Sequence, residues 1–449
     1  MRLAFDRGTV LVLDADDAAA SSLPGVVLDP RVGAWRAPAY RYPDIRRTLL
    51  RAGIEHEGLR ARAPAAAWDV PPLRDYQEAA IAAWQARGGR GTIVLPTGAG
   101  KTLVGIAAMA RAGLPVLCIV PTRVLLHQWV GAIEERLRAP VGCVGDGRRD
   151  VRPVTVATIA SAWRQMDRLG GRFGMLVVDE AHHFGGGQHD EALEMCAAPL
   201  RLGLTATPPA DAVARETLER LVGPVVYQLS VDDLAGRYLA AYELSTLWIE
   251  LTREERQAYE REMAVFRPVH RAYTSTSLDP SWPGFAAWAG RSDEGRRALA
   301  AVRRARDLLA LPSGKLRVLE SLLAQHRRRR VLVFTADNAS AYAVSRRCLI
   351  HPITCDIGAK ERDEVLARFR SGEIRALVSS RVLNEGLDVP DAEVGIVLGG
   401  RLGDREHVQR VGRVLRPADG KRALVYELVV QETTEVCAWV RRRRALAAP

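Results

Sequence analysis

The chain has 449 residues, of which 64 are basic and 53 acidic, so its formal net charge is +11. A chain of this length exceeds what one hydrophobic core can organise and predicts about two to four domains. Its composition, 48% hydrophobic and 26% charged, is typical of a soluble globular protein. The positive excess suits a polyanionic partner, although the arginine usage of a GC-rich genome would explain it equally well.

Several classes of protein are disfavoured from the outset. The six cysteines show no Cys-x-x-Cys spacing, which argues against a zinc cluster, and the chain does not resemble a small disulfide-bonded secreted domain. The first 14 residues lack a basic segment followed by a long apolar one, and no apolar run is long enough to span a bilayer. We therefore expect a cytoplasmic protein without a membrane span.

Residues 1–68 are predicted to form a short unit of their own. Gly8, Gly25 and Pro30 punctuate it as turn residues, and the segment 61–67, rich in alanine with one proline, is typical of a linker.

Between residues 69 and 235, short apolar runs alternate with amphipathic stretches. Each run has the length of a strand buried on both faces of a parallel sheet, and the stretches Lys101–Ala112 and Arg123–Leu137 suit helices. The runs are Thr92–Leu95, Val116–Val120, Val154–Thr158, Met175–Val178 and Leu202–Thr205. This alternation predicts a doubly wound α/β domain.

Residues 236–312 differ in character and are predicted to be a helical insertion. Thr252–Phe266 and Asp293–Leu311 are charged and helical in period. The aromatic residues between them, Trp282, Phe285 and Trp288, either stack on nucleic-acid bases or pack the insertion, and packing is favoured.

The α/β rhythm returns over residues 313–449. Its apolar runs are Val331–Phe334, Ala376–Ser379, Val394–Leu398 and Ala423–Leu428. The predicted fold class is therefore α/β, with two doubly wound parallel-sheet lobes, a small N-terminal domain and a helical insertion.

A phosphate-binding loop is predicted where the first lobe's apolar run 92–95 meets the helix that begins at Lys101. Glycines in this turn let backbone N–H groups face phosphate oxygens, and the helix N-terminus adds a positive end. Lys101 would reach the β- and γ-phosphates, and the Thr102 hydroxyl would hold Mg²⁺. The predicted ATP-binding residues here are Pro96, Thr97, Gly98, Ala99, Gly100, Lys101 and Thr102.

An acidic pair at the end of the run Met175–Val178 completes this site. Its position places both acids at the carboxyl edge of a parallel sheet, where ligands bind. Asp179 would hold the Mg²⁺ shell, and Glu180 would orient and deprotonate the attacking water. His182 follows closely enough to sense the γ-phosphate.

Further strings, in order along the chain, resemble the motor motifs of superfamily 2 helicases. They resemble the adenine-reading segment and motifs Ia, III, IV, V and VI. The strings are LRDYQ at 73–77, PTRVLLHQW at 121–129, LTATP at 204–208, VLVFT at 331–335, VLNEGLDVP at 382–390 and QRVGRVLR at 409–416. Leu95 stands where the general phosphate-loop pattern has a glycine, and many members of this superfamily also lack that glycine.

The resemblance implies roles for residues outside the phosphate loop. Gln77 would bond the base edge, and Arg74 or Tyr76 would pack near it. Gly386 and Asp388 would face the nucleotide, and Thr205 and Thr207 with His182 would couple ATP state to lobe closure. Arg413 and Arg416 would be arginine fingers with Gln409 near the attacking water. The implied nucleic-acid contacts are Pro121, Thr122, Arg123, Gln128, Thr158, Ser379 and Ser380.

Within the superfamily, the chain is most similar to the XPB-type DNA repair helicases in their short archaeal and bacterial form. The segments 73–77, 128–129 and 379–417 carry this similarity. It implies a damage-recognition-like domain over 1–68, RecA-like lobes over 69–235 and 313–449, and a thumb-like insertion over 236–312. It also implies 3′-to-5′ movement and opening of damaged or forked duplex in nucleotide excision repair.

One departure bears on this activity. XPB-type proteins carry an Arg-Glu-Asp triplet shortly after motif III, and this chain has Ala210, Asp211 and Ala212 there. That puts strand separation in doubt more than ATP hydrolysis. The expected partners are single-stranded or forked DNA and a nuclease, for a motor that is itself monomeric. A double-strand translocase, a nuclease-recruiting ATPase that unwinds little, and an RNA helicase remain alternatives.

Overall fold

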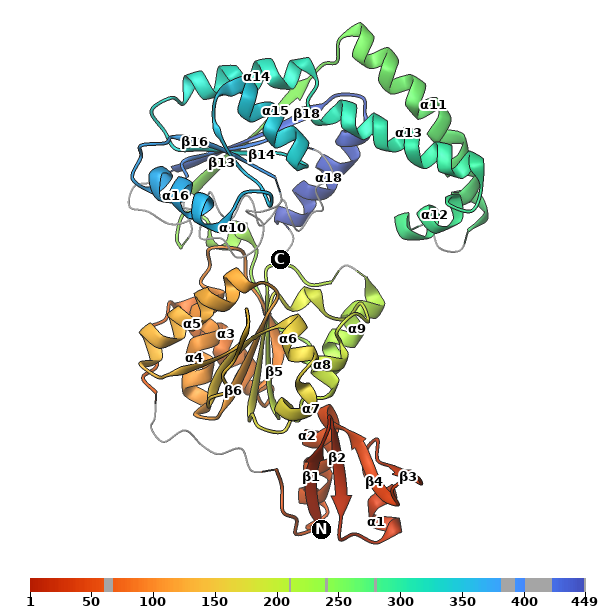
Figure 1. Cartoon of the computed structure of the whole chain (residues 1–449), viewed down its shortest axis with the longest axis vertical. Coiled ribbons are helices and arrows are strands. Elements are labelled where there is room, and N and C mark those ends of the chain that lie inside the picture. Colours follow the sequence, from red (N-terminus) through yellow and green to blue (C-terminus); the bar gives the residue numbers. More distant parts are fainter. Residues whose placement is uncertain are drawn as a thin grey trace. The chain divides into compact units, whose positions relative to one another are not determined.

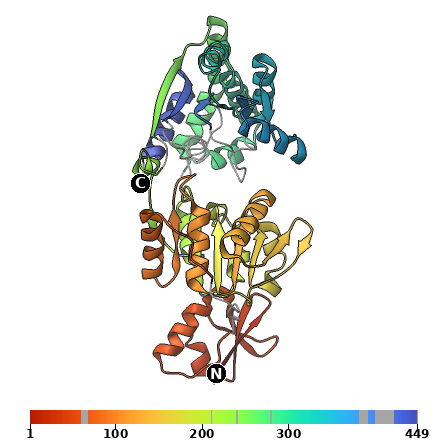
Figure 2. The same ribbon diagram turned by 90° about the vertical axis from the view of Figure 1, so that its left-hand side faces the viewer.

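The computed structural model describes residues 1–59, 68–209, 211–238, 241–277, 281–380, 392–399 and 422–447. Contacts divide the chain into two compact units, Met1–Ser230 and Val231–Ala448, which are considered separately (Figures 1 and 2). Among the described residues, no helix combines the length and apolarity that crossing a lipid bilayer requires.

The first unit begins with a small domain built on a four-stranded antiparallel sheet of order β1-β2-β4-β3. Val10 and Val12 alternate inward along β2, and Ile45 and Leu49 lie one turn apart on α2, so one core forms between sheet and helix. The elements are β1 (Arg2–Asp6), β2 (Thr9–Leu13), α1 (Asp17–Ser21), β3 (Val27–Asp29), β4 (Ala34–Pro38), η1 (Ala39–Arg41) and α2 (Tyr42–Arg51).

The larger part of this unit is an eight-stranded sheet of order β12-β5-β11-β10-β6-β9-β7-β8. All neighbouring strands are parallel except β7 and β8. The strands are β5 (Arg90–Val94), β6 (Val116–Val120), β7 (Val141–Gly145), β8 (Arg148–Arg149), β9 (Val154–Thr158), β10 (Met175–Asp179), β11 (Leu200–Thr205) and β12 (Val225–Gln228). Five of them coincide with the predicted apolar runs, because strands buried on both faces must be apolar throughout.

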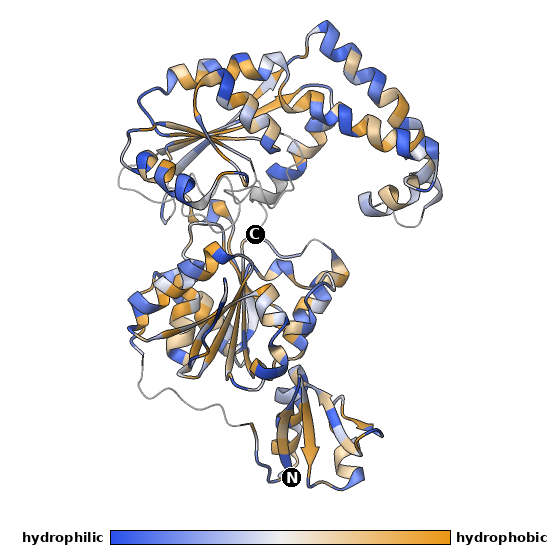
Figure 3. Cartoon of the chain, viewed as in Figure 1, coloured by the Kyte–Doolittle hydropathy of each residue, from blue (hydrophilic) through white to orange (hydrophobic). Residues whose placement is uncertain are grey.

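Helices cover both faces of this sheet (Figure 1), as expected for a doubly wound fold. The hydropathy colouring of Figure 3 shows the strands as mostly hydrophobic and the helices as two-sided. The helices are α3 (Asp75–Ala86), α4 (Lys101–Ala112), α5 (Arg123–Leu137), α6 (Ile159–Trp163), α7 (Met166–Leu169), η2 (Ala181–His183), α8 (Glu191–Glu194) and α9 (Ala212–Leu221).

The small N-terminal domain packs directly on this α/β domain. Tyr40 belongs to the hydrophobic core of the α/β domain, and Ala197 belongs to the core of the N-terminal domain. Gly171 permits the close approach, because an added Cβ would lie 2.5–2.9 Å from three atoms of the Phe5 side chain. The two domains therefore share a continuous packed boundary.

The second unit contains a six-stranded, wholly parallel sheet of order β13-β18-β17-β14-β16-β15. Its strands are β13 (Ala241–Ile249), β14 (Val331–Phe334), β15 (His351–Ile353), β16 (Ala376–Ser379), β17 (Val394–Val397) and β18 (Arg422–Val430). Its helices outside the insertion are α10 (Val231–Leu234), α14 (Ser313–Gln325), α15 (Asn338–Cys348), α16 (Ala359–Arg370) and α18 (Thr434–Ala447). The second α/β lobe is thus confirmed.

The start of the insertion differs from the prediction. Residues 241–249 were expected within the helical segment, but they form β13, which pairs in parallel with β18 along its whole length. An edge strand is only partly buried, so it lacks the continuous apolar signal of the central strands.

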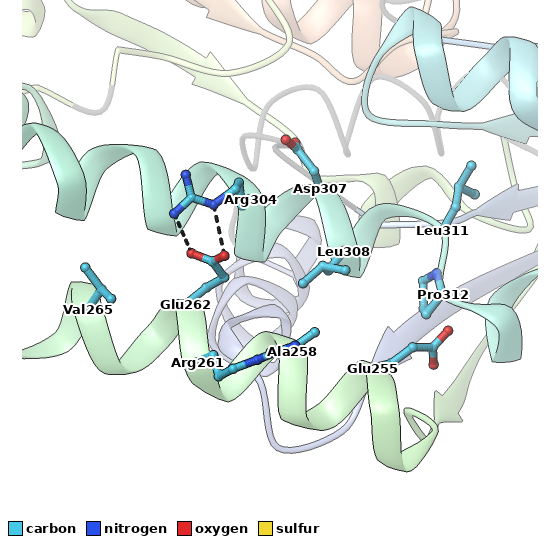
Figure 4. Close-up of a pocket in the computed structure, with 10 residues that line it drawn as sticks. All are labelled: Glu255, Ala258, Arg261, Glu262, Val265, Arg304, Asp307, Leu308, Leu311 and Pro312. Carbon is cyan, nitrogen blue, oxygen red and sulfur yellow. Dashed lines mark hydrogen bonds and ion pairs between the residues drawn. The ribbon is translucent and has the colours of Figure 1, made fainter.

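The insertion itself is helical. It consists of α11 (Arg253–Thr276), α12 (Trp282–Ala289) and α13 (Asp293–Ala310). Phe285 is fully buried against Phe266 and Tyr273, so the aromatic residues pack the insertion, while Trp282 and Trp288 stay about 40% exposed. A groove runs between α11 and α13, crossed by the Arg304–Glu262 ion pair (Figure 4).

Candidate active site

The predicted phosphate loop joins β5 to α4 at the carboxyl edge of the first sheet. Gly98 and Gly100 have φ angles of +88° and +77°, a left-handed conformation that glycine adopts without a steric penalty. Lys101 Nζ donates hydrogen bonds to the carbonyls of Leu95 at 3.1 Å and Pro96 at 3.4 Å, so the ammonium lies against the loop. The loop has the shape and the positive helix end that a phosphate group requires.

The segment predicted to read adenine lies beside this loop. Tyr76 Oη and Gln77 Nε2 both donate to the Ala99 carbonyl, at 2.7 and 3.0 Å. The Gln77 Oε1 atom accepts from the Arg74 N–H at 3.0 Å, whereas the Arg74 side chain is exposed. Because both polar ends of Gln77 bind the protein, its contact with a base stays a prediction, and its observed role is to support the loop.

Asp179 ends β10 at the same sheet edge, and its side chain is only 4% exposed. Oδ2 accepts a hydrogen bond from Trp129 Nε1 at 2.7 Å, and Oδ1 accepts from the Glu180 N–H at 2.9 Å. Burial raises the pKa of Asp179 above its usual range, while the Trp129 hydrogen bond and the Lys101 charge oppose that rise.

These features fit a divalent cation. The Asp179 carboxylate is buried and accepts hydrogen bonds from two neutral donors, so a divalent cation bound to it would offset the cost of burying its charge. Carboxylate and hydroxyl oxygens are ligands that Mg²⁺ accepts, and Asp179 and Thr102 would provide them.

Glu180 has a left-handed backbone, with φ +49° and ψ +51°. Such a conformation is uncommon for a residue with a side chain and often marks a functional site. It turns the chain sharply after β10 into η2, and the side chain is about 14% exposed.

The three predicted coupling residues come together in the structure. His182 Nδ1 lies 3.0 Å from Thr205 Oγ1, which in turn donates to the Thr207 carbonyl at 2.8 Å. When its own hydrogen is used in that bond, the Thr205 hydroxyl can accept from the His182 tautomer that carries a hydrogen on Nδ1. The end of β11 and the η2 turn are thereby joined.

Two of the predicted nucleic-acid residues lie at or just beyond the ends of neighbouring strands. β6 and β9 are paired so that Val120, two residues before Thr122, faces Thr158. Both threonine hydroxyls cap the helices that follow. Pro121 is half-buried, Arg123 and Gln128 are exposed, and this group shares the carboxyl edge with the ATP-site residues.

In the second unit, the predicted phosphate contacts are less accessible. Ser379 and Ser380 are fully buried, and their hydroxyls donate to the Ile353 carbonyl and to Asn338 Oδ1. A backbone phosphate would reach them only after local rearrangement. The predictions for Gly386, Asp388, Gln409, Arg413 and Arg416 lie outside the described residues.

Two residues of the site escaped the sequence analysis. Trp129 was noted only as part of a family string, yet it binds Asp179 directly. Asp146, in the turn after β7, lies 3.4 Å from Arg123 and 3.0 Å from His127. Neither contact has a local sequence signal, because the partners are distant in the chain.

A phosphate loop and an acidic strand end at one edge of a doubly wound sheet define a P-loop nucleotide-binding domain. Family models match residues 71–210 as "Type III restriction enzyme, res subunit", 314–418 as "Helicase conserved C-terminal domain" and 3–58 as "Xeroderma pigmentosum group B helicase damage recognition domain".

Relatives narrow the family. The "DNA 3'-5' translocase XPB2" of Sulfurisphaera tokodaii is 36% identical over 94% of this chain and 96% of its own length. The "DNA 3'-5' helicase XPB" of Kineococcus radiotolerans is 30% identical over 90% of this chain and 69% of its own. The chain belongs to the XPB family of superfamily 2 helicases.

A solved structure shares the fold. The Pyrococcus furiosus Hef helicase domain matches with a TM-score of 0.55 at 19% identity, covering 83% of this chain and 98% of that one. The two α/β lobes are accordingly RecA-like.

Proposed function

We propose that this protein is an ATP-driven DNA motor that moves 3′ to 5′ and acts in DNA repair. The observation that carries the proposal is the convergence of Lys101, Asp179, Glu180 and the His182–Thr205 contact at one sheet edge. The names of the relatives as DNA 3'-5' translocase or helicase support the substrate and the direction.

The chemistry follows from the residues of the first lobe. Lys101 leaves the carbonyls of Leu95 and Pro96 and binds the β- and γ-phosphates of ATP. Glu180 orients a water molecule and takes its proton as the water oxygen bonds to the γ-phosphorus, while the bond to the β–γ bridging oxygen breaks and ADP leaves. Mg²⁺, held by Thr102 and Asp179, would neutralise charge on the phosphate oxygens.

Movement requires the second lobe. Arg413 and Arg416 would act as arginine fingers and Gln409 would lie near the attacking water, so bound ATP favours a closed arrangement of the lobes. His182, Thr205 and Thr207 would report the state of the γ-phosphate. Loss of that phosphate removes the shared contact and lets the lobes open. Opening would shift the DNA-binding residues of one lobe along the strand.

Strand separation is the weaker part of the activity. Where XPB-type proteins have Arg-Glu-Asp, this chain has Ala210, Asp211 and Ala212, and Asp211 caps α9 by accepting a 2.8 Å hydrogen bond from the Ala214 N–H. We therefore propose that translocation dominates over unwinding, and that a nuclease partner would exploit the motor.

The test is ATP hydrolysis with single-stranded DNA, forked DNA, duplex DNA or RNA, alongside triplex displacement and forked-DNA strand separation. Stimulation by DNA with triplex displacement supports the motor. Stimulation by RNA alone would favour an RNA helicase, and hydrolysis indifferent to every polymer would overturn the motor function. A Glu180→Gln variant is the matched control, since it should bind ATP without turnover.

A further inference from the structure

The indole of Trp129 makes an interior contact with the predicted metal ligand. Trp129 is fully buried, and its Nε1 donates to Asp179 Oδ2 at 2.7 Å. The other oxygen of this carboxylate accepts from the Glu180 N–H at 2.9 Å. Two donors from different parts of the chain thus fix the rotation of one carboxylate.

Packing fixes the ring itself. Trp129 sits on α5 and faces Gly105 of α4, where an added Cβ would lie only 2.6 Å from the ring atom Cη2. The helix α4 begins with Lys101 and Thr102, so the ring is wedged between the phosphate-loop helix and the end of β10. Both side chains are buried, so close packing restrains the ring and the carboxylate in this arrangement.

The same helix reaches the proposed DNA-binding edge. α5 begins at Arg123, and its first turn is capped by the Thr122 hydroxyl, which accepts from the Leu125 N–H at 3.2 Å. Helix α5 thus carries both a predicted contact with the DNA backbone and the Trp129 hydrogen bond to the metal ligand.

We propose that Trp129 is a positioning residue that holds the Asp179 carboxylate in its metal-binding orientation and ties that orientation to helix α5. The inference rests on the proposed ATPase function. Hydrogen-bond donors behind a metal ligand orient it, and their loss typically weakens metal affinity by about tenfold or more. If nucleic acid displaces α5, the hydrogen bond from Trp129 to Asp179 would then transmit that displacement to the metal ligand.

The first variant is Trp129→Phe, which removes the N–H donor and keeps an aromatic ring. The matched control is Trp84→Phe, because Trp84 is 2% exposed in the same domain and its Nε1 donates to the Arg201 carbonyl at 2.9 Å. Both variants lose one buried indole hydrogen bond, but only the first touches the metal ligand.

The decisive measurement is the affinity of the protein–ADP complex for Mn²⁺, monitored by electron paramagnetic resonance. The complex does not hydrolyse ATP and the sample contains no DNA. We expect Trp129→Phe to weaken Mn²⁺ binding about tenfold and to raise the Mg²⁺ concentration needed for half-maximal ATPase. Trp84→Phe should leave both unchanged. In an Asp179→Asn background, Trp129→Phe should add no further loss.

Replacing Trp129 by benzothienylalanine, which keeps the ring shape without the N–H, guards against a folding defect in the phenylalanine variant. Unchanged Mn²⁺ affinity in the folded variants would overturn the inference. If the wild-type protein hydrolyses ATP and the Trp129→Phe variant binds Mn²⁺ with normal affinity, only the positioning role of Trp129 is refuted. A wild-type protein without any ATPase sinks the proposed function instead.

Discussion

Lys315 and Glu435 form an ion pair inside the second unit, with Nζ 2.8 and 2.9 Å from the two carboxylate oxygens. Lys315 is fully buried, and its Nζ also donates to the Leu309 carbonyl at 2.7 Å. Glu435 Oε2 accepts from the Val430 N–H at 3.0 Å. The pair therefore joins the starts of α14 and α18 to the last turn of α13.

Removing one partner of this pair should destabilise the protein strongly. Lys315→Met leaves the Glu435 charge buried without its partner, which costs about 3–5 kcal/mol. Adding Glu435→Gln should recover part of the loss, because the stranded charge disappears. The measurement is urea unfolding of the full chain.

The control for that prediction is a surface ion pair of similar geometry in the same unit. Arg304 and Glu262 approach to 2.8 Å across the groove of Figure 4, but Arg304 is exposed. Arg304→Met should change stability far less, since solvent screens exposed pairs. Equal losses for the two variants would contradict the argument from burial.

The left-handed backbone of Glu180 predicts that the residue best for stability differs from the residue needed for catalysis. Glycine tolerates φ +49° without the steric penalty that a Cβ incurs, so Glu180→Gly should be about 1 kcal/mol more stable than Glu180→Ala. Both variants should lack ATP hydrolysis. Differential scanning calorimetry of the two variants beside Glu180→Gln tests this, and a lower melting temperature for the glycine variant would refute it.

Docking of the N-terminal domain should depend on Gly171. An added Cβ there would lie 2.5–2.9 Å from three atoms of the Phe5 side chain, so Gly171→Ala should cost about 1–3 kcal/mol and expose the domain boundary. Hydrogen exchange in β1 and α8 would report the loosening. Gly131→Ala is the control: no atom lies within 4 Å of the added Cβ in α5, and the change should stabilise that helix.

The sequence predicted the central strands and the phosphate loop well, because both have local signals. The runs at β6 and β9 and the helices α4 and α5 have the predicted bounds, since apolar runs and a glycine-rich turn are determined within a few residues. β13 was missed because its partner β18 is distant in the chain and its own residues are only partly buried.

Some buried contacts could not be predicted from local sequence patterns. Arg201 looks like an ordinary charged residue, yet it is fully buried and donates to the carbonyls of Ala198, Leu193, Leu221 and Cys196. Burial lowers its pKa to about 10. Three of these acceptors lie within eight residues of Arg201 and the fourth belongs to Leu221 in α9, and no pattern in the sequence indicates that they converge on one side chain.

The last prediction concerns the DNA grip. Asp146 has φ +49° in the turn after β7 and lies 3.0 Å from His127 and 3.4 Å from Arg123. The hydrogen bond from His127, with the Arg123 charge, lowers the pKa of Asp146, so it is ionised at neutral pH. A carboxylate at this position would compete with a DNA phosphate for Arg123, one of the proposed DNA contacts.

Asp146→Asn should therefore bind single-stranded DNA more tightly, by about fivefold at low salt, with the gain shrinking as salt rises. Asparagine tolerates the left-handed turn, so the fold should be unchanged. Glu135→Gln is the control, because it removes one negative charge from an exposed position farther along α5. Fluorescence anisotropy at several salt concentrations measures the affinity of each variant for single-stranded DNA. An equal gain in affinity for both variants would mean that net charge alone is responsible. A gain confined to Asp146→Asn would identify Arg123 and His127 as the DNA contact that Asp146 restrains.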